Sequence, residues 1–160
     1  MFFRYSLLSL FLIFIPVSSL CQSLGKSTLS GLDSVSVIVD GPKGKGGLTQ
    51  KHLKTRIELR LRKAGIGVRE FSPQGAASKI YPAVYVRVGA SEAKGGYVYA
   101  ATLEVLQVVT LSTGENSLAA TYKIPGAVGW TSRDELASNV DEAVIGRVEV
   151  FANEWLEVHN

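Results

Sequence analysis

The stretch that decides the fold is 34–71, which reads SVSVIVD (34–40), GPKGKGG (41–47), LTQKHLKTRIELRLRKAG (48–65) and IGVREF (66–71). In the first piece, valines alternate with other residues, which is typical of a β-strand buried on at least one face. A glycine-rich loop, a helical pattern and a second strand at 67–71 follow. This order predicts a β-α-β unit, whose two strands are normally parallel.

The helix of this unit has a start signal and a stop signal. The hydroxyl of Thr49 is placed to accept a hydrogen bond from a free backbone N–H of the first turn. Gly65 follows the last apolar residue and suits the left-handed conformation that ends many helices. Between them, apolar residues recur at helical spacing and predict one buried stripe. The stripe consists of Leu53, Ile57, Leu61 and Ala64.

Three more strands are expected further along the chain. Alternation of apolar and polar residues predicts strands at 83–90, 97–111 and 118–124. The strand at 97–111 is long, so we expect a bend or a bulge near its middle. Pro125 lacks a backbone N–H and Gly126 is a poor strand residue, so this pair is expected to end the last strand.

A terminal helix is expected to begin near Ser132. Ser132 and Glu135 have the spacing of a capping box, in which each side chain satisfies a free backbone N–H of the other residue. The apolar stripe of this helix consists of Leu136, Val140, Val144, Val148, Phe151 and Trp155. The resulting order is β-α-β-β-β-β-α. It predicts an α+β fold with one mostly antiparallel sheet and two helices packed on one face.

The charges divide between the two halves of the chain. Lys26–Lys94 contains 13 Lys or Arg and 5 Asp or Glu, whereas Gly95–Asn160 contains 3 and 9. Charge asymmetry of this kind marks either an interaction surface or two elements that neutralise each other. Both clusters fall on expected helices, so we expect the basic helix to lie beside the acidic one.

The N-terminal residues read as an export signal. Arg4 precedes an apolar run at 7–17, and small residues follow, as a signal peptidase requires. We assign 1–22 to a cleaved signal, 23–33 to a flexible lead-in and 34–160 to a single domain. The residues before Cys21 do not match a lipid-attachment pattern, so we do not expect an anchor there. Cys21 is the one cysteine of the chain, so no intramolecular disulfide is expected.

The pieces VSVIVD (35–40), Leu53…Ile57…Leu61…Ala64-Gly65 and VREF (68–71) resemble the first half of a group of bacterial envelope domains. The group includes the curli-secretion lipoprotein, the N-terminal domain of the Tol-system translocation protein and the lipoprotein activators of penicillin-binding proteins. The resemblance implies an α+β domain that is a non-enzymatic part or regulator of an envelope assembly. It brings no catalytic residues.

The glycine-rich loop and the helix after it suggest an anion site. Backbone N–H groups at a helix N-terminus attract anions, and Lys43, Lys45, Lys51 and Lys54 surround this one. The spacing is not that of a dinucleotide fingerprint, because Thr49 occupies the third glycine position. Binding of phosphate, nucleic acid or anionic lipid is thus an alternative function. The other interpretation is a solvated loop, and the helix carries no aromatic residue that would favour nucleic acid.

Four aromatic residues form a second candidate surface. We expect Tyr97, Tyr99, Tyr122 and Trp130 to cluster on the sheet and to provide a contact patch for a partner.

Catalytic residues are few. His52 lies on the polar flank of the first helix and His159 near the end of the chain, and neither stands in a nucleophile or metal motif. The acidic pairs 134–135 and 141–142 share one helix face, but ligands from one straight helix cannot surround a calcium ion. We expect no catalytic residue, metal or cofactor. A small hydrolase with His52 as its base is the second alternative.

Together these features favour an exported, periplasmic or extracellular, non-catalytic protein that binds or helps to assemble other components of the cell envelope. The expected partner is another envelope protein or a second copy of the chain.

Overall fold

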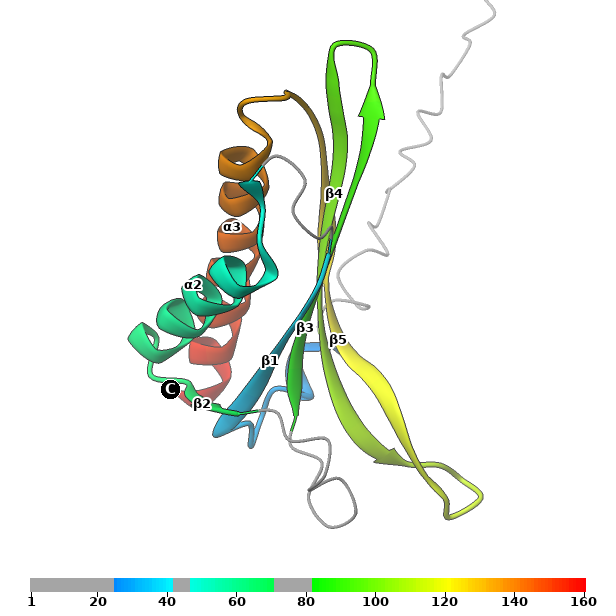
Figure 1. The fold of residues 1–160 in the computed structure, drawn as a ribbon. Coiled ribbons are helices and arrows are strands. Elements are labelled where there is room, and N and C mark those ends of the chain that lie inside the picture. The colour runs from blue at the N-terminus through cyan, green and yellow to red at the C-terminus, as the bar shows by residue number, and fades with distance from the viewer. Residues whose placement is uncertain (1–24, 42–46, 71–81) are drawn as a thin grey trace, which may run out of the picture.

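The computed structural model describes residues 25–41, 47–70 and 82–160 and has an α+β fold (Figure 1). Its elements follow the expected order of one strand, a helix, four strands and a helix. They are β1 (Ser34–Asp40), α2 (Gln50–Lys63), β2 (Gly67–Arg69), β3 (Ala83–Ala93), β4 (Gly96–Thr110), β5 (Asn116–Ser132) and α3 (Leu136–His159).

The five strands form one mixed sheet in the order β2-β1-β3-β4-β5. β1 is parallel to both β2 and β3, whereas the longer ladders that join β3 to β4 and β4 to β5 are antiparallel. The parallel β1–β2 pair confirms the expected β-α-β unit. The hairpins after it extend the sheet away from α2 and produce the three long strands.

α2 and α3 lie on the same side of the sheet, and neither covers the opposite face (Figure 1). α2 packs on β1 and β2, α3 packs on β4 and β5, and the helices contact each other. The expected helical stripes are confirmed, since all residues of both stripes, Ala64 and Trp155 included, are buried or partly buried in one core. Removal of this apolar surface from water is the main force that holds the layers together.

The ends of α2 are formed as the sequence predicts. The Thr49 hydroxyl accepts a hydrogen bond from the backbone N–H of His52 at 3.2 Å. Gly65 has a φ of 85°, which the absence of a Cβ atom permits, and the chain turns there into β2.

The expected end of the last strand at Pro125 is wrong. β5 continues to Ser132, because the sheet accommodates the proline in a bulge. Its register against β4 shifts by one residue between the Ala101 and Leu103 pairs and again between the Val105 and Leu106 pairs, and in both cases the extra residue belongs to β5. The expected irregularity of the long β4 strand therefore arises from its neighbour.

The expected capping box at Ser132 is also wrong. Ser132 is the last residue of β5, and its hydroxyl donates to the Glu135 side chain at 3.0 Å instead of bonding to the backbone. α3 begins at Leu136, and the side chain of its N-cap residue, Glu135, makes no capping bond.

Residues 25–33, which the sequence assigns to a flexible lead-in, pack against the domain. Leu29 and Leu32 are buried in the core, and the indole N–H of Trp155 donates to the carbonyl of Leu32 at 2.7 Å. The Thr28 hydroxyl donates to the carbonyl of Thr121, which lies in the second irregular step of β5. This N-terminal turn is thus part of the folded domain.

Candidate functional site

The sheet face that α2 and α3 leave uncovered carries exposed apolar side chains at both ends: Val108 lies opposite Leu118 at one end, and a larger group lies at the other. Val98 of β4 lies directly opposite Trp130 of β5, and Ala100 lies opposite Val128 in the next pair on the same face. The exposed fractions are 43% for Val98, 59% for Trp130 and 76% for Val128. We call Val98, Ala100, Val128 and Trp130 the Trp130 platform.

Two glycines of the β3–β4 turn lie beside the indole of Trp130. A Cβ atom at Gly96 would lie 3.1 Å from Cζ2 of Trp130 and 2.1 Å from the carbonyl oxygen of Thr131. A Cβ atom at Gly95 would lie 4.0 Å from the same ring. A side chain at Gly96 would therefore crowd the indole ring.

The middle of the same sheet face is polar. The hydroxyl of Tyr85 donates to the Asp40 carboxylate at 2.9 Å and accepts from the Arg87 guanidinium at 3.3 Å. The ammonium group of Lys123 lies 3.0 Å from the Glu104 carboxylate. These charges satisfy one another, so the middle of this face is less suited than the platform to contact an apolar partner.

The structure does not bring together the four aromatic residues that were expected to form a contact patch. Tyr97 and Tyr122 are buried among the core residues, and Tyr99 is partly buried against them. Trp130 lies on the opposite face, since its partner across the ladder is Val98. Of these four residues, Trp130 belongs to the platform, whereas Tyr97, Tyr99 and Tyr122 pack in or against the core.

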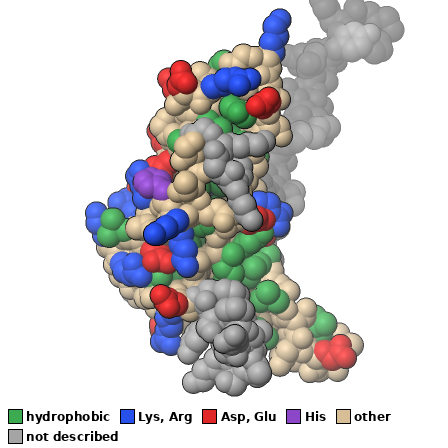
Figure 2. Space-filling view, in the orientation of Figure 1, with side chains coloured by type: hydrophobic (Ala, Val, Ile, Leu, Met, Phe, Trp, Pro, Cys, Tyr) green, Lys and Arg blue, Asp and Glu red, His purple; other side chains and the backbone are tan. Residues whose placement is uncertain are grey.

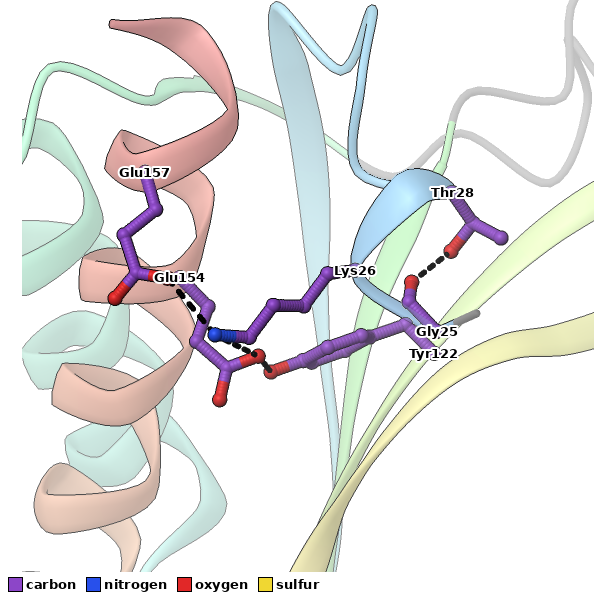
Figure 3. A network of polar contacts seen from close by, with 6 residues as sticks. All are labelled: Gly25, Lys26, Thr28, Tyr122, Glu154 and Glu157. Atoms are coloured by element: carbon purple, nitrogen blue, oxygen red, sulfur yellow. Dashed lines mark hydrogen bonds and ion pairs between the residues drawn. The ribbon is translucent and has the colours of Figure 1, made fainter. Parts of the chain in front are cut away.

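Tyr122 belongs to a polar network that fixes the N-terminal turn (Figure 3). Its hydroxyl donates to the Glu154 carboxylate at 2.8 Å. The ammonium group of Lys26 donates to Glu157 at 2.8 Å and lies 3.8 Å from Glu154. Burial, followed by the hydrogen bond to Glu154, raises the pKa of the Tyr122 phenol. The network joins the turn, β5 and α3, and its partners are all mutually satisfied.

The candidate anion site is described in part. Lys43 and Lys45 lie outside the described residues. Lys51 and Lys54 line a shallow depression beside β1, and the Lys54 ammonium group lies 3.8 Å from the Glu58 carboxylate.

Two arginines of α2 pair with carboxylates of α3. Arg56 pairs with Asp141, and the Arg60 guanidinium lies 2.7 Å from the Glu149 carboxylate. His52 Nε2 lies 3.9 Å from Asp141 Oδ1. Figure 2 shows Lys and Arg side chains over α2 with acidic side chains among them. The expected pairing of a basic helix with an acidic helix is thus confirmed.

Within residues 25–41, 47–70 and 82–160, no group of three His, Cys, Asp or Glu side chains is placed to hold a metal ion. Neither α2 nor α3, the helices of the described part, is long and apolar enough to cross a membrane.

No protein-family model matches this chain, and no curated protein matches it. Among solved structures, it is similar to a PelC dodecamer from Paraburkholderia phytofirmans, with 16% identity, a TM-score of 0.40 and coverage of 74% of this chain and 85% of that one. It is also similar to a minor lipoprotein from Acinetobacter baumannii, with 11% identity, a TM-score of 0.33 and coverage of 78% and 91%. Similarities this low identify neither a family nor a function.

Proposed function

We propose that this chain is an exported, non-catalytic binding domain that contacts another protein of the cell envelope through the Trp130 platform. The observation that carries the proposal is the exposure of Val98, Val128 and Trp130 as neighbours on one sheet face. Single exposed apolar residues are normal on protein surfaces, whereas contiguous groups of them mark sites of interaction.

The geometry of Trp130 supports a role in binding. Tryptophan is enriched among the residues that dominate binding energy, because it buries a large area and loses few rotamers. Gly95 and Gly96 leave room beside the indole, since a Cβ atom at Gly96 would lie 3.1 Å from its Cζ2 atom. The polar residues beside the platform provide the more hydrated rim that protein interfaces have.

The test is capture of a partner that depends on Trp130. The tagged chain is expressed in its own cells with its export signal, crosslinked gently and purified. We expect one specific envelope protein to be recovered by the wild type and to be reduced at least about tenfold by Trp130→Ala, the loss expected for a hot-spot residue.

The matched control is Leu118→Ala. Leu118 is also an exposed apolar residue of β5, with an exposed fraction of 54%, but it lies near the other end of the strand. This variant should capture the partner as the wild type does, and thermal unfolding should verify that both variants are folded. Equal capture by wild type and Trp130→Ala, or recovery of no partner, would refute the proposal.

A further inference from the structure

β5 forms one border of the sheet. In the part of the chain that the structure describes, β4 is its sole neighbour. The outer side of an edge strand presents backbone N–H and C=O groups that can pair with another strand. The opposite border is β2, with 3 residues, whereas β5 has 17. The long edge therefore offers far more backbone for pairing than the short one.

Features that discourage pairing are confined to one part of β5. Lys123, Pro125 and both register shifts lie between Ala120 and Ala127. Charged side chains, prolines and bulges are the usual means by which edge strands avoid association. From Ala127 to Ser132 the sequence is AVGWTS, with no charge and no proline, and its register against β4 is continuous. Asn116–Ala119, at the other end of β5, also lacks these features, but only Ala127–Ser132 contains Val128 and Trp130 of the platform.

We propose that Ala127–Ser132 pairs in antiparallel fashion with the same segment of a second copy of the chain. A two-fold axis at Gly129, perpendicular to the sheet, places Trp130 of each copy directly opposite Val128 of the other. Residues opposite each other in an antiparallel pair point to the same face. Both platforms then join on the uncovered face, while all helices remain on the other.

The second copy is the occupant that this segment fits, because the register is self-complementary. It creates a continuous row of Val98, Trp130, Val128 and Ala100 across four strands, and the two-fold axis repeats that row. Aromatic and β-branched side chains are favourable cross-strand partners, and Val98 with Trp130 already forms such a pair within one chain. No charged side chain lies between Lys123 and Arg133, so none is brought against a like charge in the paired segment.

Gly129, the residue on the proposed two-fold axis, is also compatible with this pairing of two β5 strands. A Cβ atom at Gly129 would lie 2.6 Å from the Tyr99 ring, so the ring covers Gly129 on the helix-bearing side. The paired segment, Ala127–Ser132, is short, so it buries little surface compared with the roughly 1,200 Å² or more of most specific complexes. We therefore expect a dimer that dissociates on dilution.

This inference goes beyond the proposed function, because it requires no other protein. It is tested with the purified chain alone, so its failure would leave capture of an envelope partner unaffected. Conversely, a dimer would still form if no such partner existed.

The first experiment is sedimentation equilibrium over a concentration series up to about 200 µM, a range that detects weak self-association. Wild type should change from monomer to dimer. Val128→Lys should stay monomeric, because lysine on an edge opposes pairing. Leu118→Lys, on the same strand but outside the segment, should behave as wild type. A monomeric wild type, or a Val128→Lys variant that dimerises equally, would overturn the proposal.

The second experiment tests the register. Val128→Cys and Trp130→Cys are prepared separately, mixed and oxidised, and the linked tryptic peptide 124–133 is identified by mass spectrometry. Directly opposite residues are close enough for a disulfide, whereas diagonal ones are about 7–8 Å apart between Cα atoms. The 128–130 link should therefore predominate in the mixture. Predominance of 128–128 or 130–130 links would exclude the Gly129 axis.

Discussion

Replacement of Leu29 by alanine tests whether the N-terminal turn is part of the folded domain. Leu29 is fully buried, although it precedes the first strand. The substitution removes three carbon atoms, which at about 0.8 kcal/mol for each buried CH₂ amounts to roughly 2.4 kcal/mol. A cavity adds to this cost, but a segment near the chain end is able to relax and partly fill it. We therefore expect a loss of about 3 kcal/mol in the free energy of unfolding.

The assay is urea unfolding followed by circular dichroism, with a thermal scan beside it. A loss of this size should lower the melting temperature by about 8–12 °C for a domain of this length. Leu118→Ala is the matched control, because the same chemical change occurs at an exposed position and should cost less than about 0.5 kcal/mol. If Leu29→Ala behaves like this control, the turn contributes no stability and the reasoning is refuted.

Three further predictions concern stability. A Cβ atom at Gly146, within α3, would meet no atom within 4 Å. Gly146→Ala should therefore raise the free energy of unfolding, measured by urea titration, by about 0.5–1 kcal/mol. A lower free energy of unfolding would contradict this prediction. The pKa of Tyr122 is raised in the folded state, so its contribution to stability is complete below the unfolded value of about 10 and declines as pH rises above it. Wild type should therefore lose more stability than Tyr122→Phe between about pH 9 and pH 11, and parallel pH profiles would show that the phenol is not responsible. Arg56→Gln leaves the Asp141 side chain, which is 13% exposed, without its closest cation and should cost about 1 kcal/mol at low salt. Unfolding measured at low and high salt should show a smaller difference in high salt, and an equal cost at both would argue against an electrostatic origin.

Local periodicity is enough to predict most of the fold. The stripes Leu53–Ile57–Leu61 and Val140–Val144–Val148 are buried as their spacing indicates. Side chains at helical spacing share one face whatever surrounds them, so this information is contained in the sequence. The same applies to Thr49 and Gly65, whose effects act within a single turn of backbone.

Interactions between distant residues caused the errors. Pro125 ends a strand by local rules, but β4 holds the chain on both sides of it, so the strand continues through a bulge. The capping box at Ser132 failed because the same residue is paired with Gly96 in the sheet. Leu29 and Leu32 have no periodic pattern that would predict their burial, and the turn that holds them is bonded to Thr121 of β5 and Trp155 of α3, more than 80 residues away in the sequence.

Interactions between distant residues also explain why the sequence did not predict the Trp130 platform. Because the last strand was expected to end before it, Val128 was not recognised, and Tyr97, Tyr99 and Tyr122 were grouped with Trp130 by residue type alone. The face on which each aromatic side chain lies depends on strand register, which a bulge changes by one residue.

The order of the elements, the buried faces of the helices and the opposite charges of α2 and α3 can be predicted from residues a few positions apart. Three features appear only in the folded chain: the sheet face that α2 and α3 leave uncovered, the end of β5 and the apolar side chains that meet on its exposed surface. Those features arise from pairing and packing between distant segments, and the free energy of these contacts exceeds the local preference of any single residue.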